Sequence, residues 1–357
     1  KGCQAGSVMA MAVMGNPDQY YNYMTSKQFY IGNEHHLRSG LDFLKEKASL
    51  SEEESFNIAA SMQKLTEDVV KSIITTYSKA NPSKNLCLSG GVVLNSVMSG
   101  KMFDWFDDIY DDIYMCPVCY DAGLAIGSAQ WVWHQELDNP RVEWNKNASP
   151  YLGKQYSRND IDNAIEKFSE EVEFKEADDD QVLDKISDQK IVSVFGGGSE
   201  SGRRALGNRS ILADPRSKEM KDIINEKVKH RQWYRPFAPA ILREEVSKWF
   251  VRDIESPYMG FVIKFKEDVI DKVPAVVHYD GSGRLQTVRE EDNEWFYGLL
   301  KKWHEKSGVP ILLNTSFNDR EPIVETAEDA IKCFLGTEID HLYFFDEKIL
   351  LSKRKSQ

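Results

Sequence analysis

The amino-acid sequence predicts a mixed α/β (α+β) fold built from two domains. The chain has 357 residues, of which 41% are apolar and 29% charged, and this is enough to bury two hydrophobic cores. Short apolar runs typical of strands and longer segments with helical periodicity alternate in both halves of the chain. Several of the strand-like runs end in glycine-containing turns that lead into a helix. No run approaches the roughly twenty apolar residues of a membrane helix, so no membrane segment is expected.

The first half predicts a long helix followed by two strand–turn–helix units. Residues 51–80 have an apolar stripe at helical spacing and begin with a serine followed by glutamates, which is typical of a helix start. Residues 85–100 predict a strand, a Ser-Gly-Gly turn and a helix. Residues 107–129 repeat the plan, with a helix that begins at Asp121. Such turns can point backbone N–H groups at an anion, although a tight turn that needs glycine for a positive φ explains the same pattern.

The second half begins after a segment rich in Asn, Pro, Ser and Gly at residues 135–160, where we place the domain boundary. The expected domains are therefore residues 1–145 and 146–357. Beyond the boundary the predicted elements, in order, are a helix (DIDNAIEKFSEEV), a strand running into a glycine turn (KIVSVFGGG), a helix at 217–230, a buried strand ending in small polar residues (VPILLNTSFN), a capped helix (ETAEDAIKCFLGT) and a terminal hairpin (DHLYFFDEKILLSK).

Charge is distributed unevenly along the chain. The formal net charge of −12 argues against a general binder of nucleic acid or membrane surfaces. Residues 196–243 nevertheless contain eleven Lys and Arg against five Asp and Glu. Arg204, Arg209 and Arg235 lie among small or rigid neighbours in expected loops, where a guanidinium offers a planar fork to phosphate or carboxylate oxygens. Neither a Walker P-loop nor a dinucleotide-binding glycine pattern is present, so these residues alone predict an anion-binding α/β protein.

The five cysteines are too few and too scattered for a disulfide framework. They indicate a reducing, cytoplasmic environment. Cys116 and Cys119 have the spacing of a redox or metal pair, but a zinc site would need a second pair. Two half-buried thiols near a strand end are the simpler interpretation.

Several segments, in order, resemble the O-carbamoyltransferases of nodulation and antibiotic tailoring. GRRALGNRSILADPR, KHRQWYRPFAPAIL, ESPYM, VPAVVHYDGSGRLQTV and GVPILLNTSFNDREPIVET resemble the C-terminal domain of that family. GSVMAMAVMGNP, LCLSGGVVLNS and YDAGLAIGSA resemble the later half of its N-terminal domain. The resemblance implies that residues 1–145 are the later half of an actin/hexokinase-like (ASKHA) domain. It also implies that residues 146–357 are a YrdC-like twisted-sheet α/β domain.

The resemblance implies a two-step reaction. Carbamoyl phosphate and ATP would give carbamoyl adenylate in the C-terminal domain, with Mg²⁺ on the triphosphate. The carbamoyl group would then pass, in the N-terminal domain, to a hydroxyl of a sugar, a natural product or a hydroxymethylated nucleobase or nucleotide. The resemblance implies Fe²⁺ or a similar metal in that domain. The acceptor is therefore open, and nucleic acid is one candidate that the acidic net charge does not favour.

The family motifs map onto residues of this sequence. A K-x-R motif falls on Lys229 and Arg231, and an S-x-N motif on Ser316 and Asn318; these are the expected catalytic residues. Fixed cations would stabilise charge on the reacting phosphate, and serine and asparagine supply donors and acceptors for a carbamate. Without the resemblance, NTSFN would be a strand-ending turn. The residues expected to bind phosphate or nucleotide are Arg204, Asn208, Arg209, Ser210, Arg235 and Asn314 in the second half and Ser89, Gly90, Gly91 and Asn95 in the first.

The metal site and two family positions depart from the pattern. Asp121 matches a metal ligand, although by itself it is expected to be a helix N-cap. The family's H-x-x-x-H pair is absent, and His35 and His36 are expected in a loop. Half of the acceptor site would then come from a missing N-terminal segment or from another chain, such as the second subunit of a homodimer. The family's usual arginine and proline are Gly198 and Arg203 here, and the sequence leaves open whether the glycine widens the pocket and whether Arg203 replaces the lost charge.

Two other functions fit part of the sequence. A nucleotide-binding regulatory protein that has lost turnover would explain the missing histidines. A kinase of the actin/hexokinase superfold would explain the Ser-Gly-Gly turn but not the arginine-rich second half. Carbamoyl-phosphate-dependent exchange of pyrophosphate into ATP separates the carbamoyltransferase interpretation from both of these alternatives.

Overall fold

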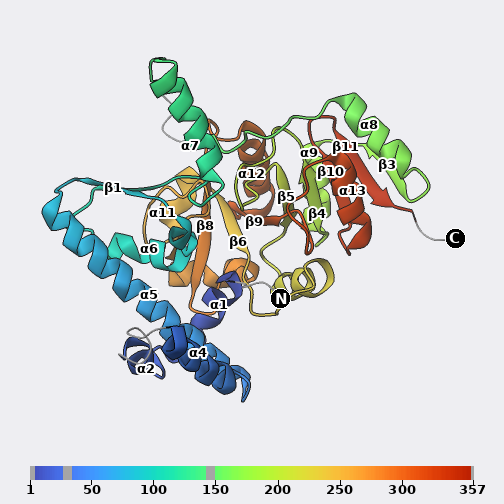
Figure 1. The fold of residues 1–357 in the computed structure, drawn as a ribbon. Helices are drawn as coiled ribbons and strands as arrows, with labels where there is room; N and C mark the ends of the chain where they lie inside the picture. The colour runs from blue at the N-terminus through green and yellow to red at the C-terminus, as the bar shows by residue number, and fades with distance from the viewer. Residues whose placement is uncertain (1–4, 27–33, 142–148, 355–357) are drawn as a thin grey trace. The chain divides into compact units, whose positions relative to one another are not determined.

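The computed structural model describes residues 5–26, 34–141 and 149–354, and it confirms the mixed α/β prediction (Figure 1). The chain forms two compact units. One contains Lys1–Cys87 and Asn95–Tyr114, and the other contains Leu88–Leu94 and Met115–Gln357. The predicted domain boundary between residues 145 and 146 lies outside the described residues and stays a prediction. Among the described residues, no helix has both the length and the apolar character needed to cross a bilayer.

The first unit is mainly helical. Its helices are α1 (Ala5–Ala12), α2 (Tyr21–Thr25), α4 (Glu34–Ala48), α5 (Glu52–Ala80) and α6 (Ser96–Trp105), and a two-stranded sheet pairs β1 (Asn85–Leu88) with β2 (Asp112–Met115). The Ser51 side chain accepts the Glu54 N–H at 3.1 Å and starts α5 where the sequence predicted. The predicted apolar stripe is buried only in the first half of α5, because Val69 and Ile73 are 45% and 50% exposed. His35 and His36 lie in α4, so the loop prediction for them was wrong.

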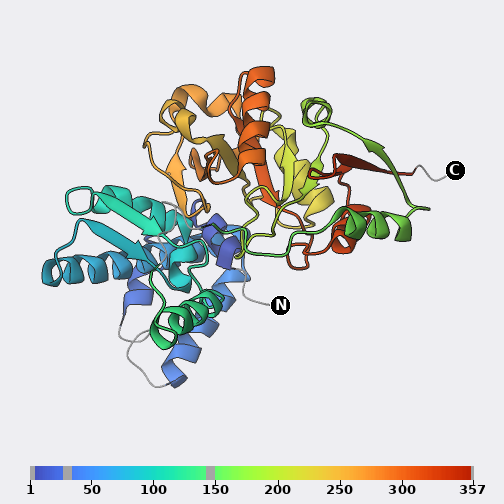
Figure 2. The same cartoon turned by 90° about the horizontal axis from the view of Figure 1, so that it is seen from above.

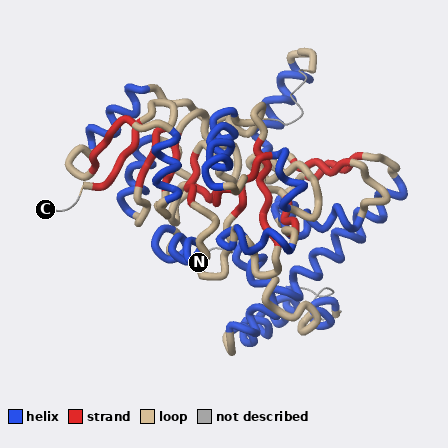
Figure 3. Tube along the Cα trace, turned by 180° about the vertical axis from the view of Figure 1, so that it is seen from behind, coloured by secondary structure: helices blue, strands red, loops and turns tan. Residues whose placement is uncertain are grey.

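The second unit contains a nine-stranded mixed sheet with the strand order β3-β11-β10-β4-β5-β9-β6-β8-β7 (red in Figure 3). The antiparallel register of β5 and β9 sets Ser210 opposite Ser316, and that of β9 and β6 sets Asn314 opposite Ala238. The strands are β3 (Val172–Glu176), β4 (Val192–Phe195), β5 (Arg209–Ala213), β6 (Ala238–Leu242), β7 (Phe261–Lys264), β8 (Ser282–Val288), β9 (Ile311–Ser316), β10 (His341–Phe344) and β11 (Ile349–Lys353).

Helices cover both faces of this sheet. The core on one face includes Tyr343 of β10, Val194 of β4 and Trp303 of helix α12, which is orange in Figure 2. Because side chains alternate along a strand, Phe195 and Phe344 point to the other face, where α13 contacts β4 and β10. The helices are α8 (Arg158–Lys167), α9 (Asp179–Ser187), α10 (Glu219–Ile223), α11 (Val246–Trp249), α12 (Glu294–Ser307) and α13 (Ala327–Gly336).

Shorter helical turns complete the unit. They are η1 (Gly91–Leu94), η2 (Val132–Glu136), η3 (Ile224–Val228), η4 (Arg243–Glu245), η5 (Glu267–Lys272) and η6 (Pro274–Val276), and helix α7 spans Gly123–Trp131. The predicted helix at 217–230 is confirmed as α10 continuing into the π-helical turn η3. The capped helix α13 and the β10–β11 hairpin are confirmed as well. The prediction was wrong at the end of α8, which stops at Lys167 before β3 begins at Val172.

Candidate functional site

Arg209 holds the glycine bend that follows β4. Its side chain is completely buried and donates to the carbonyls of Gly196 at 2.6 Å, Asn208 at 2.9 Å and Gly197 at 3.3 Å. Its guanidinium lies 3.7 Å from the centre of the Phe195 ring. These contacts take most of the donors that the sequence assigned to phosphate, so Arg209 shapes the bend.

Glu200, which the sequence interpretation missed, holds the loop between the bend and β5. One carboxylate oxygen accepts three backbone N–H groups, from Leu206 at 2.7 Å, Asn208 at 2.9 Å and Arg209 at 3.3 Å. Burial raises the pKa of this carboxyl. The only sign of this role in the sequence was that Glu200 is an acidic residue within a stretch rich in Lys and Arg. Because the protein's own carboxylate occupies these amides, side-chain cations are left to bind an external anion.

Replacing Glu200 by alanine is expected to lower the free energy of unfolding by about 2–3 kcal/mol, because three backbone donors lose their acceptor. Glu200→Gln keeps a side-chain oxygen and is expected to lose less. Urea denaturation measures both, with Glu219→Ala as the control, since Glu219 is exposed and accepts a hydrogen bond from the neighbouring Ser217 hydroxyl. A loss equal to that of the control would rule out this role for Glu200.

Lys229 brings the two predicted motifs together. It follows the π-helical turn η3, is 3% exposed, and its Nζ donates to the Ser316 carbonyl at 2.5 Å. Nζ also donates to the Asn318 carbonyl at 2.7 Å and to Asn318 Oδ1 at 2.8 Å, while Ser316 Oγ donates to the same Oδ1 at 2.6 Å. Burial, followed by the positive charge of Arg231, lowers the pKa of Lys229 to about 7.

Arg231, Arg235 and Arg204 continue the positive charge away from Lys229. Arg231 Nε donates to Asn225 Oδ1 at 2.7 Å, and its guanidinium lies 4.7 Å from the Phe237 ring centre. Burial, followed by the charge of Arg235, lowers the pKa of Arg231 to about 9. Burial also lowers the pKa of Arg204, and the charges of Arg203 and Arg235 add to the effect. These guanidiniums therefore lie close enough to repel one another.

Arg284, at the start of β8, joins this cluster although the sequence interpretation did not single it out. Its Nε donates to the Met259 carbonyl at 2.8 Å, and one Nη donates to the Leu94 carbonyl at 3.5 Å. Burial lowers its pKa well below the ordinary value, with the charges of Arg204 and Arg235 adding to the effect. Its only sequence signal was its place in VPAVVHYDGSGRLQTV.

The cation cluster is defined here as Lys229, Arg231, Arg235, Arg204 and Arg284. Among the described residues, none of the five forms an ion pair with a carboxylate. Lys229 is buried. The four arginines keep some accessible surface, although neighbouring groups shield them from much of the water. Unpaired cations in such surroundings are costly unless an anion compensates them.

Asn314, Ser210 and Asn208 support the loop next to the cluster. Asn314 Nδ2 donates to Gln286 Oε1 at 2.7 Å, but its Oδ1 is buried without a partner. Ser210 Oγ accepts the Gly207 N–H at 3.0 Å. Asn208 Nδ2 donates to the Gly198 carbonyl at 2.8 Å. Asn314 Oδ1 is therefore the buried acceptor in this group that is left without a hydrogen-bond partner.

The two departures from the family pattern have local explanations. A side chain at Gly198 would place its Cβ 2.8 Å from the Tyr151 carbonyl oxygen and 2.9 Å from that of Gly153. The glycine therefore accommodates neighbouring backbone and does not widen a pocket. Arg203 is exposed, and its guanidinium lies 4.6 Å from the centre of the Tyr120 ring.

The predicted nucleotide turn of the first half is divided between the two units. Ser89, Gly90 and Gly91 form an exposed turn in the second unit, where Gly90 has φ +101° and its N–H donates to the Cys119 carbonyl at 2.6 Å. Asn95 belongs to the first unit and caps α6, accepting the Met98 N–H at 3.2 Å. The Asn95 side chain therefore has a structural role.

The described residues do not fit the predicted iron site. Asp121 is exposed, and no group of three His, Cys, Asp or Glu side chains in the described part of the chain is arranged to hold a metal ion. Its alternative role as a helix cap was wrong too, because α7 has Ala122 at its N-cap with no side-chain bond.

A small pocket lies beside the same loop but does not coincide with the cation cluster. Its lining includes Tyr151, Tyr258, Gln286, Asp292 and Asn293. Tyr151 donates its hydroxyl to the Leu206 carbonyl at 3.2 Å. With an aspartate in its wall and no arginine, this pocket is a poor match for a phosphate, so the cluster remains the candidate site.

Two family models match this chain. The carbamoyltransferase N-terminus matches residues 7–130, and the carbamoyltransferase C-terminus matches residues 183–353. The chain belongs to the carbamoyltransferase family. All five residues of the cation cluster lie within the part that matches the carbamoyltransferase C-terminus.

Curated relatives agree with the family. Nodulation protein NolO of Bradyrhizobium diazoefficiens is 36% identical over 94% of this chain and 63% of that protein. Protein sll1178 of Synechocystis sp. is 37% identical over 83% of this chain and 52% of that protein. Protein MJ1058 of Methanocaldococcus jannaschii is 34% identical over 95% of this chain and 57% of that protein. The chain thus spans 52–63% of the length of these three relatives.

A solved structure gives a weaker match. Full-length HypF in its phosphate- and nucleotide-bound form aligns with 69% of this chain and 36% of that chain, at a TM-score of 0.34 and 13% identity. A score this low establishes neither a shared fold nor a shared site. The specific ASKHA and YrdC-like arrangement therefore stays a prediction.

Proposed function

We propose that this carbamoyltransferase chain forms carbamoyl adenylate from carbamoyl phosphate and ATP and supplies the carbamoyl group to an acceptor hydroxyl. The observation that carries the proposal is the cation cluster, whose positive charges have no carboxylate in ion-pair contact among the described residues. Strongly perturbed pKa values of this kind are typical of functional sites. Two polyanionic substrates would supply the missing negative charge.

The proposed step requires charge compensation at a phosphate. Carbamoyl phosphate and water would give carbamate and phosphate, and a carbamate oxygen would then attack the α-phosphate of ATP as pyrophosphate leaves. Lys229 and the arginines of the cation cluster would stabilise the charge on the phosphate oxygens, because they are held in place before reaction. When bound, Mg²⁺ would neutralise part of the triphosphate charge.

Polar groups beside Lys229 are suited to a carbamate. Asn314 Oδ1 is a buried acceptor without a partner, and the carbamate N–H groups are donors. Ser316 Oγ and Asn318 Oδ1 lie within hydrogen-bond distance of Lys229 Nζ, at 3.3 and 2.8 Å. These residues would bind the carbamoyl donor next to the ammonium that compensates its charge.

Exchange of labelled pyrophosphate into ATP tests the adenylate step. We expect exchange only when carbamoyl phosphate is present and none with acetyl phosphate, which lacks the carbamoyl N–H groups. Absence of exchange would contradict adenylate formation and favour the regulatory alternative. That alternative is not favoured here, because Lys229, Ser316 and Asn318 are all present and in contact.

The acceptor is proposed only as a hydroxyl compound, such as a sugar or a natural product. Mass spectrometry of products formed from ATP, carbamoyl phosphate and a panel of hydroxyl acceptors would identify it. Nothing in the described residues supports a nucleic-acid acceptor or a homodimer. Transfer to no member of a broad panel, together with normal exchange, would separate the adenylate step from the transfer step.

Binding of a nonhydrolysable ATP analogue is expected to weaken as the pH rises above about 7. In the anion-free protein Lys229, whose pKa is lowered to about 7, loses its proton in this range. The bound anion favours the protonated form, so binding above pH 7 takes up a proton and the association constant falls by up to about tenfold per pH unit. Calorimetry between pH 6.5 and 8.5, in buffers of different ionisation enthalpy, measures both quantities.

The matched control for this pH dependence is Lys229→Arg. Its guanidinium stays charged across the range, so the variant should lose the proton uptake whatever its absolute affinity. Subtracting its profile removes the titration of the nucleotide itself. Identical pH profiles for the two proteins would contradict titration of Lys229.

A further inference from the structure

Cys116 and Cys119 lie at the two ends of one tight turn. After β2 ends at Met115, Pro117 and Val118 form the two central residues of the turn. The cysteines are therefore the first and fourth residues of a β-turn, whose Cα atoms lie within about 7 Å of each other. Disulfides join cysteines with Cα atoms about 4.4–6.8 Å apart, so the backbone already brings this pair close to bonding distance.

The two thiols differ in access to solvent. Both are free, but Cys116 is partly exposed while Cys119 is only 2% exposed. Burial raises the pKa of Cys119, and a charge on Cys116 would raise it further, which shows that the thiols lie near each other. An oxidant would thus reach Cys116 first, and Cys119 would then react with it across the turn.

The turn is attached to the loops around the cation cluster. The Cys119 carbonyl accepts the Gly90 N–H at 2.6 Å. The Pro117 carbonyl oxygen is 3.1 Å from where a Cβ on Gly202 would lie, so the turn packs directly on the segment preceding Arg204. The Cys119 thiol also lies close enough to Arg204 and Arg284 for their charges to lower its pKa, against the larger effect of burial.

We propose that Cys116 and Cys119 are an oxidation site for hydroperoxides, and that closing their disulfide weakens anion binding by the cation cluster. In the first step the Cys116 thiol and a hydroperoxide give a sulfenic acid and water or an alcohol. In the second step Cys119 sulfur attacks the Cys116 sulfur, the disulfide bond forms and a second water leaves. A dithiol reductant reverses the change. The regulatory part rests on the proposed function, whereas disulfide formation does not.

Closing the disulfide disturbs the site for a geometric reason. The two sulfurs must come within about 2.05 Å of each other, so Cys119 turns its sulfur toward Cys116. Its carbonyl, which holds Gly90, and the neighbouring Pro117 carbonyl, which packs on Gly202, then shift with the turn. Small displacements of positioned charges are enough to weaken binding strongly.

The test compares the reduced and peroxide-treated forms of the full chain. Mass spectrometry of the intact protein and of its peptides should show the loss of two hydrogen atoms and a link between Cys116 and Cys119. Calorimetry with carbamoyl phosphate and with inorganic phosphate should show about tenfold weaker binding after oxidation, restored by dithiothreitol. Cys116→Ser should bind both anions like the reduced protein, and peroxide should not change its affinity. Cys87→Ser, which removes an exposed cysteine outside the turn, should still lose affinity after peroxide treatment.

Two results would overturn the proposal. One is a protein in which peroxide forms no link between Cys116 and Cys119. The other is a linked protein with unchanged affinity for inorganic phosphate. If the reduced protein binds inorganic phosphate but gives no carbamoyl-phosphate-dependent exchange, the proposed function fails, and the oxidation site is still decided by the mass and the phosphate affinity.

Discussion

Lys229→Met is expected to reduce carbamoyl-phosphate-dependent ATP–pyrophosphate exchange by about 10³-fold, at the upper end of the cost of removing one fixed charge-stabilising group. The buried ammonium donates to Ser316 and Asn318, so its loss removes a charge and releases the polar groups that it holds. Because methionine has a similar length and no charge, packing is largely kept. Exchange assays at saturating ATP and carbamoyl phosphate measure the effect.

Lys227→Met is the matched control, two positions away. Lys227 is exposed, and its Nζ lies 3.3 Å from Glu338 in a solvent-accessible ion pair. Such pairs contribute about 0–1 kcal/mol, so this variant should exchange like the unaltered protein. Circular dichroism confirms that both variants are folded. Exchange by Lys229→Met within about threefold of the control would contradict the role of Lys229, since a tenfold change corresponds to only about 1.4 kcal/mol.

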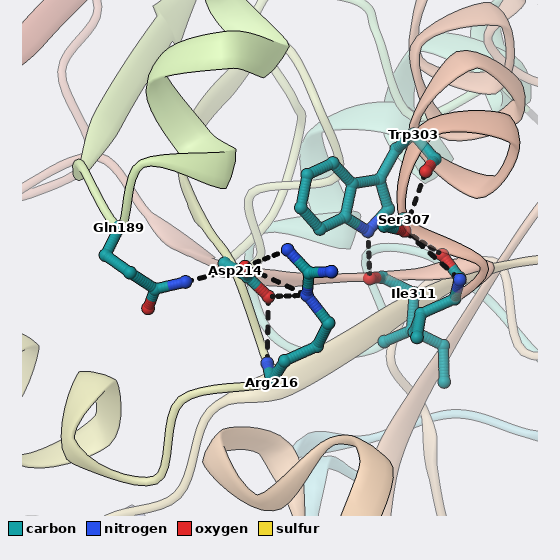
Figure 4. A network of polar contacts seen from close by, with 7 residues as sticks. Gln189, Asp214, Arg216, Trp303, Ser307 and Ile311 are labelled. Carbon is teal, nitrogen blue, oxygen red and sulfur yellow. Dashed lines mark hydrogen bonds and ion pairs between the residues drawn. The ribbon is translucent and has the colours of Figure 1, made fainter.

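Asp214→Ala is expected to lower the free energy of unfolding by about 1–3 kcal/mol, because the donors that bond to the buried Asp214 lose their acceptor while the Arg216 side chain, which is 36% exposed, can still be hydrated. Asp214 is fully buried, and its contacts with Gln189 and Arg216 are drawn in Figure 4. It accepts from Arg216 Nε at 2.9 Å, from an Arg216 Nη at 2.7 Å and from Gln189 Nε2 at 2.7 Å. The Arg216 guanidinium also lies 5.1 Å from the ring centre of Trp303, a completely buried residue of α12.

Urea denaturation of the unaltered protein, of Asp214→Ala, of the double variant with Arg216→Met and of Glu338→Ala separates loss of these contacts from general destabilisation. Asp214→Ala should be the least stable. Adding Arg216→Met should recover part of the loss, because the guanidinium then no longer lies unpaired beside Trp303. Glu338→Ala, which removes an exposed partner of Lys227, should change stability by less than about 1 kcal/mol. A loss below that value for Asp214→Ala would show that the contacts of Asp214 do not stabilise this part of the sheet.

Arg216 and the cation cluster show how far sequence reasoning reached. All of these arginines except Arg284 occur in one cationic stretch, and composition alone does not separate them. Arg216 has a buried aspartate two residues away, whereas Arg209 is enclosed by backbone carbonyls. Arg204 and Arg284 have no carboxylate partner among the described residues. Which cation is structural and which is free depends on the folded surroundings.

The sequence by itself determined the elements whose causes are local. The Ser51 and Thr326 caps started α5 and α13 as predicted, because a cap needs only the three residues that follow it. The ordered sequence motifs likewise identified the family of the chain. Local sequence patterns failed where packing between distant residues determines the structure. The second half of the apolar stripe on α5 is exposed, and Gly198 is required by the nearby backbone of Tyr151 and Gly153.

Only the tertiary structure decided how the candidate site is assembled. Lys229 meets Ser316 across 87 positions of sequence because η3 and the end of β9 meet in the folded unit. Arg284 joins Arg204 from another part of the sheet, and Glu200 selects the loop conformation by binding three N–H groups. Burial and mutual repulsion then lower the pKa values of these cations. Such effects depend on distances between remote residues, which no local pattern in the sequence specifies.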